Sequence, residues 1–236
     1  MASDQAVSGT LYGVGVGPGD PELMTVKAWR LISTAEVIAY LCANGKESTA
    51  RDIAKPFIAD GTREIAIDMP MRVEREPGEA AYDKGAELIA TTLDQDQDVV
   101  MLCEGDPFFY GSFMYIFERL AEKYKTIVVP GVTSITAAAA AIGQPLVARN
   151  EVLKILPATL DAEQLRDELQ TCTSAAIIKV GRHFGKVKLI LSALDLITKA
   201  TAIENATHEN QKITAIENIE ADNLPYFTTI IVRNIA

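Results

Sequence analysis

The stretch Leu102–Ser112, LCEGDPFFYGS, holds the side chains of this sequence that are best suited to do chemistry. An apolar run, Val99–Cys103, leads into it and an apolar-periodic segment, 113–120, follows it, which predicts a buried strand, a tight turn and a helix. Two acids, Glu104 and Asp106, stand at the turn, where open α/β sheets place their ligand sites. A plain Gly-Asp-Pro turn that caps a helix explains the stretch equally well. The rest of the chain must therefore decide.

A second candidate site is the glycine loop GVGVGPGD, Gly13–Asp20, which follows a predicted strand at 10–16. Its spacing does not fit the dinucleotide pattern GxGxxG, and no Lys-Ser or Lys-Thr follows, as a P-loop requires. Pro18 also lacks the N–H donor that a phosphate cradle needs. A proline between glycines instead presents a rigid apolar edge, which suits a flat neutral group. A tight strand-to-helix turn remains an equal alternative.

Strands and helices alternate along the chain, which predicts an α/β fold with a parallel sheet. The expected strands are 10–16, 37–40, 63–67, 99–103, 125–129, 151–156, 175–180, 201–204, 213–217 and 226–232. The expected helices are one that starts at Pro21 and buries Leu23, Val26, Ala28, Leu31 and Ile32, then 48–55, 79–93, 111–123, the alanine-rich 136–143, 161–169 and 186–194. Residues 69–78 are expected to form a polar loop. We predict two α/β domains, 1–124 with the glycine-proline loop and the Gly-Asp-Pro turn, and 125–236.

Composition excludes several classes of function. The net charge of −10 argues against a nucleic-acid partner. The start of the chain lacks the pattern of a signal peptide, and no apolar run is long enough to span a bilayer. Three scattered cysteines, Cys42, Cys103 and Cys172, form no CxxC pair and suggest a reducing compartment, so we expect a cytoplasmic protein without a membrane partner.

Familiar catalytic signatures are missing. The chain has no GxSxG, no HExxH and no Cys/His cluster, so a hydrolase elbow and a protein-bound metal are not expected. Asp68, Glu104 and Asp106 could form a carboxylate group for a glycosidase or a metal site, but acids at turns are common. His183 is interpreted as a solvated loop residue. The pattern favours a protein that positions substrates which bring their own reactivity.

Several short segments occur in a characteristic order: GVGPGD at Gly15, EGDPFFYGS at Glu104, PGVTS at Pro130, KVGR at Lys179 and IENAT at Ile203. This order resembles the tetrapyrrole methylase family, the class III S-adenosylmethionine-dependent methyltransferases, from residue 10 to the end. The resemblance implies two α/β domains with an active-site cleft between them, commonly in a homodimer. It also implies S-adenosylmethionine as the methyl donor, S-adenosylhomocysteine as its product, and no metal bound by the protein.

The resemblance also implies a set of cofactor-binding residues. The glycine-loop proline is Pro18, and the trio that holds the cofactor by its backbone and a carboxylate is Glu104, Gly105 and Asp106, with Glu104 in place of the usual glycine. An apolar contact falls on Phe109. The implied set is completed by the small pair Thr133 and Ser134, by Val180 as a backbone contact to the adenosine, and by Ala206, which replaces the glycine of an Asn-Gly-Thr motif.

Within the family, the runs MPMRVEREPG and AYDKGAELI together with CEGDPFFYGSFMYIFERL are most similar to the branch that methylates C-20 of precorrin-2, or of its cobalt-bearing counterpart, in cobalamin biosynthesis. The proton acceptor is not identified; Asp106 and Tyr110 are weak candidates. Carboxylates of the tetrapyrrole need cationic partners, and we expect them among Arg72, Arg75, Arg149, Lys179 and Arg182.

Two other interpretations stay open. The protein could be another member of the same family, such as a diphthine synthase or an rRNA ribose methyltransferase, although the acidic charge disfavours RNA. It could also be a binding module or nucleotide-binding regulator without catalytic activity, which predicts no methyl transfer and no affinity for tetrapyrroles.

Overall fold

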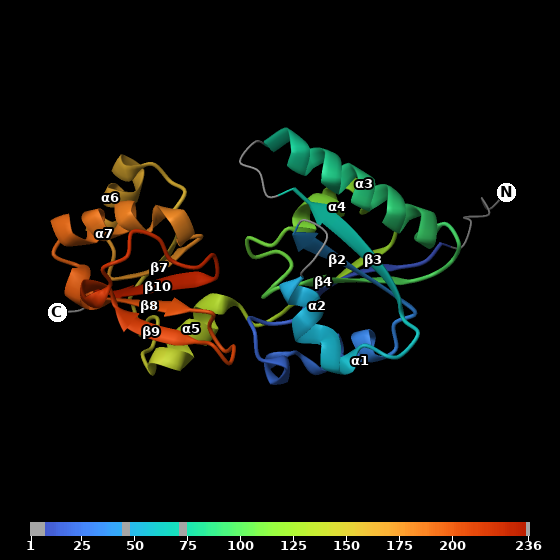
Figure 1. The fold of residues 1–236 in the computed structure, drawn as a ribbon, viewed down its shortest axis with the longest axis horizontal. Helices are drawn as coiled ribbons and strands as arrows, with labels where there is room; N and C mark the ends of the chain where they lie inside the picture. The colour runs from blue at the N-terminus through green and yellow to red at the C-terminus, as the bar shows by residue number, and fades with distance from the viewer. Residues whose placement is uncertain (1–7, 44–47, 71–74, 235–236) are drawn as a thin grey trace. The chain divides into compact units, whose positions relative to one another are not determined.

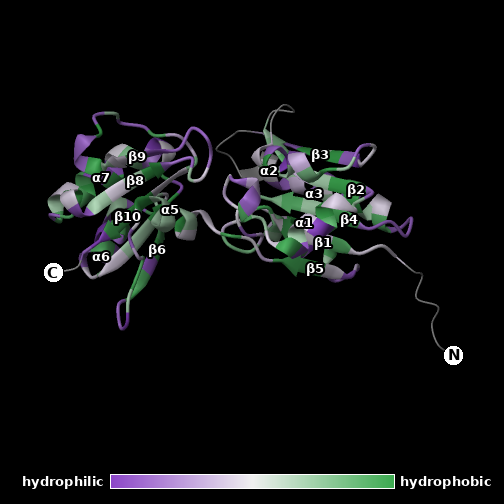
Figure 2. Cartoon of the chain, turned by 90° about the horizontal axis from the view of Figure 1, so that it is seen from below, coloured by the Kyte–Doolittle hydropathy of each residue, from purple (hydrophilic) through white to green (hydrophobic). Residues whose placement is uncertain are grey.

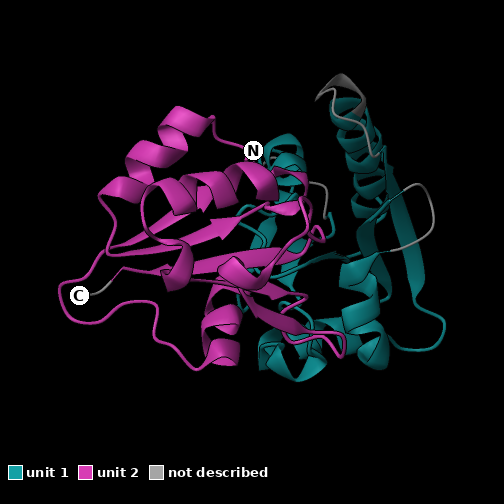
Figure 3. Cartoon of the chain, turned by 60° about the vertical axis from the view of Figure 1, so that its left-hand side comes forward, with its two compact units in different colours: residues 1–133 teal, residues 134–236 magenta. Residues whose placement is uncertain are grey.

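The computed structural model describes residues 8–43, 48–70 and 75–234. The chain divides into two compact units, Met1–Thr133 and Ser134–Ala236 (Figures 1 and 3). Each unit has its own sheet and its own helices, so each is described by itself. Apolar residues gather in the strands of both units, and many connecting loops are hydrophilic (Figure 2). No helix in the described part of the chain combines the length and apolarity that crossing a membrane requires.

Unit 1 contains a five-stranded sheet in the order β3-β2-β4-β1-β5, and all its neighbouring strands are parallel. The strands are β1 (Leu11–Gly15), β2 (Val37–Ala43), β3 (Arg63–Met69), β4 (Val99–Cys103) and β5 (Thr126–Val129). The central strand β4 is buried along its whole length. A strand that is covered on both faces needs apolar side chains at every position, and the sequence VVMLC of β4 has this pattern.

Helices cover both faces of this sheet. They are α1 (Val26–Ser33), α2 (Thr49–Ala54), α3 (Arg75–Leu93) and α4 (Phe113–Leu120). Side chains alternate across a strand, so Met101 packs with α3 and α4 on one face, while Leu102 packs with α1 and α2 on the other. Unit 1 is therefore a doubly wound α/β layer of the kind that the sequence predicts.

The adjacent strands β1 and β4 mark the point where the connections of the sheet change direction. The chain leaves β1 through α1 on one face and reaches β2, whereas it leaves β4 through α4 on the opposite face and reaches β5. Open α/β sheets bind ligands outside the carboxyl ends of the strands at such a switch point. The fold therefore draws attention to the residues that follow β1 and β4.

Unit 2 contains a mixed five-stranded sheet in the order β6-β7-β10-β8-β9, in which β6 and β7 are parallel and β10 is antiparallel to both β7 and β8. The strands are β6 (Leu153–Pro157), β7 (Ser174–Ile178), β8 (Ala200–Glu204), β9 (Lys212–Ala215) and β10 (Thr228–Arg233). The helices are α5 (Ser134–Ile142), α6 (Ala162–Gln170) and α7 (Phe184–Ala193). Because β7 and β8 both run antiparallel to β10, their carboxyl ends lie at the same edge.

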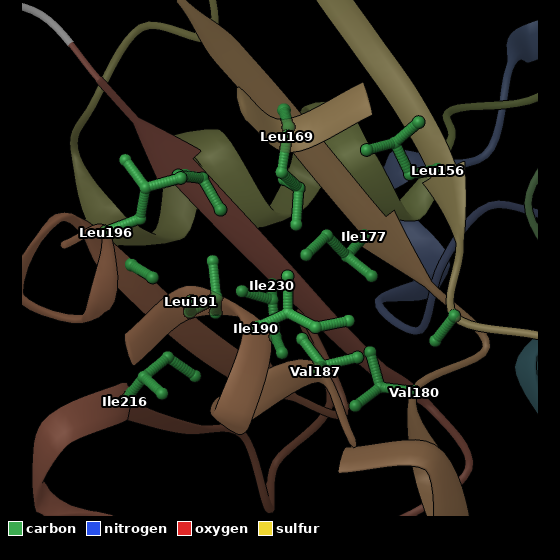
Figure 4. Close-up of a cluster of buried hydrophobic side chains, with 14 of the residues drawn as sticks. Leu156, Leu169, Ile177, Val180, Val187, Ile190, Leu191, Leu196, Ile216 and Ile230 are labelled. Carbon is green, nitrogen blue, oxygen red and sulfur yellow. The ribbon is translucent and has the colours of Figure 1, made fainter. Parts of the chain in front are cut away.

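The core of unit 2 lies between this sheet and helices α6 and α7. Leu191 of α7 packs toward Ile177 of β7 and Ile230 of β10, and Leu169 of α6 closes the same cluster (Figure 4). Helix α5 lies against β10. Burial of these aliphatic side chains stabilises unit 2 by roughly 1.5–3 kcal/mol per side chain.

Some boundaries differ from those expected from the sequence. Asp20 caps a short 3-10 turn, Pro21–Leu23, by accepting a hydrogen bond from the Glu22 amide at 2.8 Å. Thr25 then starts α1 anew, which leaves Val26 79% exposed instead of buried.

The expected polar loop 69–78 was also too long, because α3 already begins at Arg75. The proline at position 77 falls in the first turn of α3, where its missing N–H leaves no bond unmade. Strand β10 begins at Thr228 instead of Tyr226. The domain boundary expected after Tyr124 would place β5 in the second sheet, whereas β5 pairs with β1 in the first.

Candidate active site

Three strand ends of unit 1 meet through their main chains. Beyond β1, the Gly17 amide donates to the Gly105 carbonyl at 3.4 Å, and the Gly105 amide donates back to the Gly17 carbonyl at 2.8 Å. The Val16 amide also donates to the Cys103 carbonyl at 2.9 Å. The loop that carries Pro18 is thereby joined to the Gly-Asp-Pro corner, and the two candidate stretches of the sequence form one site.

The third strand end approaches so closely that no side chain fits. A Cβ atom on Gly15 would lie 2.5 Å from the Gly105 carbonyl oxygen, and one on Gly131 would lie 2.0 Å from the same oxygen. Gly105 itself has a φ of +62°, a conformation that glycine adopts without strain. Glycine at these positions leaves a surface made of backbone groups beyond β1, β4 and β5.

Asp106 fixes this surface with both of its carboxylate oxygens. Its Oδ1 accepts a hydrogen bond from the Phe108 amide at 2.9 Å, and its Oδ2 accepts one from the Gly131 amide at 3.0 Å. The first bond closes the turn after β4, and the second ties that turn to the end of β5. The geometry therefore assigns Asp106 a structural task in the corner.

Glu104 points elsewhere. Its Oε1 accepts a hydrogen bond from the Ala50 amide at 3.2 Å, in the first turn of α2. The residue as a whole keeps exposed surface, but its carboxyl lies among packed strand ends. The lost hydration raises the pKa of Glu104 above its ordinary value, although the Ala50 amide favours the charged form. The backbone amide of Glu104 itself also favours the charged form of this carboxyl.

The aromatic residues of the corner surround the turn. Phe109 is half-buried and packs edge-on against Tyr110 with ring centroids 5.3 Å apart. Tyr110 is 43% exposed and has a φ of +55°, which is uncommon for a residue with a side chain. Pro18, directly after the Gly17 bridge, is half-buried, as is Thr133 after the β5 corner. The predicted residues of unit 1 thus collect at one edge of its sheet.

The predicted residues of unit 2 occupy two similar turns. Val180 follows β7 between Lys179, with a φ of +56°, and Gly181. Ala206 follows β8 between Asn205 and Thr207, with φ values of +48° and +69°. Val180 and Ala206 are both buried as whole residues, so their contact with a cofactor stays a prediction. These turns lie at the same edge of the second sheet; Ser134, at the start of α5, is half-buried.

The cationic residues of unit 2 that were expected to bind the tetrapyrrole do not all lie at the same place. Lys179 and Arg182 are exposed at the carboxyl end of β7, beside the Val180 turn. Arg149 lies before the amino end of β6, where the Ser174 hydroxyl donates to the Leu146 carbonyl at 2.6 Å. Because β6 and β7 are parallel, this is the opposite edge of the sheet, so Arg149 does not join the others.

The other two residues that were expected to bind the tetrapyrrole, Arg72 and Arg75, belong to unit 1. Arg72 lies outside the described residues. Arg75 is the first residue of α3 instead of part of a loop. The role of both in substrate binding stays a prediction. His183, in the turn after Val180, has a pKa lowered by burial and by the nearby charges of Lys186 and Arg182.

Two relationships of the site were not predicted. One is the bond between Glu104 and the start of α2, which joins residues far apart in the sequence. The other is the approach of three glycine turns, for which the recurrence of glycine after β1, β4 and β5 is the only signal. In the described residues, His, Cys, Asp and Glu side chains do not gather in groups of three that could hold a metal ion.

The protein is a two-unit α/β protein. Its candidate site is a corner built from glycines at the switch point of a doubly wound sheet. The sequence profile of the Tetrapyrrole (Corrin/Porphyrin) Methylases matches residues 10–220. The chain belongs to this family, as its motifs suggest.

Individual relatives refine this assignment. Precorrin-2 C(20)-methyltransferase from a Sinorhizobium species is 34% identical over 232 residues, which cover 95% of both chains. Cobalamin biosynthesis protein CobIJ from Mycobacterium tuberculosis is 41% identical over 228 residues, but the chain spans only 45% of that longer protein. A solved structure of uroporphyrin-III C-methyltransferase from Thermus thermophilus, complexed with S-adenosylhomocysteine, is 22% identical with a TM-score of 0.66, covering 95% of this chain and 97% of that one.

Proposed function

We propose that this protein transfers a methyl group from S-adenosylmethionine to C-20 of precorrin-2, which gives precorrin-3A in cobalamin biosynthesis. The observation that carries the proposal is the nearly full-length match to a precorrin-2 C(20)-methyltransferase. The glycine-built corner of unit 1 supports it, because the corner lies where this class of fold binds its ligands.

The residues of the corner fit the methyl donor. Gly15, Gly105 and Gly131 bring their backbones together so closely that a Cβ atom on Gly15 or Gly131 would collide with neighbouring backbone atoms, so the corner is built of backbone groups. Backbone N–H and C=O groups can read the polar edges of a nucleoside and an amino acid. Pro18 and Phe109 add apolar surface for the flat part of such a molecule.

The chemistry needs little from the side chains. When bound, S-adenosylmethionine supplies a methyl group attached to a sulfonium. The bond between this methyl group and sulfur breaks, its electrons stay on sulfur, and the methyl carbon forms a new bond to C-20. The reduced tetrapyrrole is electron-rich and serves as the nucleophile. The protein holds the two partners in line, an arrangement that accelerates the reaction without a strong base. C-20 must then release a proton to an acceptor.

Asp106 and Tyr110 remain our candidates for that acceptor. Both oxygens of Asp106 already accept backbone hydrogen bonds. These bonds favour a role for Asp106 in holding the corner over a role as proton acceptor. The Tyr110 ring is exposed and sits in a strained backbone conformation, which functional sites often contain.

The carboxylates of the tetrapyrrole need cations, and Lys179 and Arg182 are exposed beside the Val180 turn. An arginine can bind a carboxylate through two parallel hydrogen bonds. We assign these two residues to the substrate, and the homodimer implied by the resemblance stays a further prediction that sedimentation can check.

The test is methyl incorporation from labelled S-adenosylmethionine into precorrin-2, with and without cobalt in the macrocycle. Labelling of the metal-free substrate supports the proposal. Labelling only in the presence of cobalt supports the alternative, a cobalt-factor II C(20)-methyltransferase of the anaerobic route. Absence of labelling in both, with S-adenosylhomocysteine still bound, would point to another member of the family.

A further inference from the structure

Glu104 occupies the place where the resemblance implies a glycine, and the structure gives the carboxylate a specific partner. Its Oε1 accepts a hydrogen bond from the amide of Ala50, the second residue of α2. The next amide, that of Arg51, donates to the hydroxyl of Ser48 at 3.3 Å. In the first turn of α2, one backbone amide therefore donates to the N-cap residue and another donates to a side chain from the end of β4.

The main chain and the side chain of Glu104 run in different directions. The main chain continues into Gly105, which bridges to Gly17 beyond β1. The side chain lines a small pocket at the strand ends, to which Leu41 of β2 and Ala50 of α2 also contribute. One residue thus connects the backbone corner to the start of a helix.

Helix α2 is short, and its attachment to the sheet depends on few contacts. Ala50, Ile53 and Ala54 are its buried residues, and they pack in the same cluster as Leu102 of β4. A helix of six residues has little stability of its own in water. A bond from the end of β4 to its first turn therefore fixes α2 and the end of β4 relative to each other.

We propose that Glu104 is a positioning residue, whose carboxylate ties the first turn of α2 to the end of β4 and so holds the Gly105 corner in the shape that binds the methyl donor. This inference rests on the proposed function. The carboxylate acts through the corner and needs only an acceptor oxygen, which a glutamine also provides.

The experiment compares Glu104→Ala and Glu104→Gln in the full chain. Amide exchange at Ala50 reports the bond directly, and calorimetry gives the affinities for S-adenosylmethionine and S-adenosylhomocysteine. In Glu104→Ala we expect faster exchange at Ala50 and both affinities weakened by a common factor of about three to ten, the range for loss of one hydrogen bond. Glu104→Gln should restore most of the protection and most of both affinities.

Asp161→Ala is the matched control. Asp161 caps α6 in unit 2 by accepting a hydrogen bond from the Gln164 amide at 2.9 Å, so its loss also removes a helix-start bond. We expect this variant to lower thermal stability without changing either affinity. The comparison separates general destabilisation from loss of the Glu104 bond.

Three results would overturn the proposal. Unchanged exchange at Ala50 in Glu104→Ala would remove the bond from consideration. A Glu104→Gln variant that binds S-adenosylmethionine more weakly but S-adenosylhomocysteine, which lacks the sulfonium, equally well would show that the carboxylate acts on the sulfonium charge. Loss of methyl transfer in Glu104→Gln with both affinities intact would make Glu104 the proton acceptor.

Failure of the proposed function would look different. A wild-type protein that binds the donor but does not label the tetrapyrrole would contradict the substrate assignment, while the exchange and affinity measurements would still decide the role of Glu104. A wild-type protein that binds neither form of the donor would overturn both.

Discussion

Asp106 accepts a hydrogen bond from the backbone amide of Gly131 at 3.0 Å, and this single contact joins the corner beyond β4 to the corner beyond β5. In the sheet, β1 lies between these two strands. The bond therefore passes over the end of β1, where Gly15 leaves no side chain in the way. A carboxylate suits this place because two N–H donors face its two oxygens.

The first prediction concerns Asp106→Asn. An amide offers one acceptor oxygen, so its NH₂ group must face either the Phe108 or the Gly131 amide, donor against donor. We expect the free energy of unfolding to fall by about 1–3 kcal/mol and the affinity for S-adenosylhomocysteine to fall by about tenfold. Thermal denaturation and calorimetry measure both, and equal affinity in variant and wild type would contradict the role of Asp106 in the corner.

The second prediction concerns Gly131→Ala. The added Cβ atom would lie 2.0 Å from the Gly105 carbonyl oxygen, so the backbone must move. We expect a loss of about 1–3 kcal/mol in the free energy of unfolding, typical of overpacking, together with loss of donor binding. Gly78→Ala in α3 is the control, because nothing lies within 4 Å of its added Cβ atom. That variant should be neutral or slightly more stable, as helical alanine is.

The third prediction concerns the pH dependence of stability in unit 2. Glu151 accepts a hydrogen bond from the Ala148 amide and pairs with Arg233 at 2.8 Å, and these contacts lower its pKa. An acid whose pKa is lower in the folded state adds stability above its unfolded pKa and loses it as the pH falls through the folded value. Glu151→Gln should therefore lower the melting temperature at pH 7, by an amount that shrinks toward pH 3.

The environment of Arg233, the partner of Glu151, should make the loss of thermal stability in Glu151→Gln larger. Arg233 is buried, it also donates to the Leu146 carbonyl, and its Nε atom has no hydrogen-bond partner in the described structure. Removal of the Glu151 charge leaves a buried cation without its counter-charge. Glu209→Gln, at an exposed acid of the same unit, is the control and should leave the melting curve almost unchanged. Equal pH profiles for Glu151→Gln and wild type would refute this account.

The fourth prediction concerns substrate binding. Arg182→Glu places a negative charge beside the Val180 turn, where we expect a carboxylate of the tetrapyrrole, and it should weaken tetrapyrrole binding at least about tenfold. Affinity for S-adenosylhomocysteine should stay within about twofold, because the exposed Arg182 side chain is assigned to the tetrapyrrole and not to the cofactor. Arg166→Glu, on the exposed side of α6, serves as a control for net charge. Fluorescence titration measures the binding, and equal losses in the two variants would indicate a general charge effect.

The sheet elements were largely predictable from the sequence because their signals are local. Val99–Cys103 is an uninterrupted apolar run and appears as β4 with the expected bounds. The start of α1 was not predictable, because Asp20 and Thr25 are both good caps and only tertiary packing decides that the first serves a short 3-10 turn. The start of α3 was hidden by a proline, which marks a loop as readily as a first helical turn.

The candidate site was predictable only in part. The motifs around Pro18 and Asp106 lie on strand ends that the Gly17–Gly105 bridge brings together, while their role in cofactor binding stays a prediction. The bond from Glu104 to Ala50 depends on how α2 packs on the sheet, which no local pattern encodes. The place of Arg149 depends on tertiary pairing in the same way: the parallel pairing of β6 and β7 puts it at the other edge of the sheet from Val180, which its loop position did not reveal.

Cys103 ends β4 one residue before Glu104, with 5% of its surface exposed. Burial, and then the charges of Glu104 and Asp106, raise the pKa of its thiol well above the ordinary value. Sulfur nucleophiles react as thiolates, and this one stays protonated and covered. Under the proposed function, the corner beside Cys103 holds an alkylating agent, and burial of the thiol would guard the protein against modifying itself.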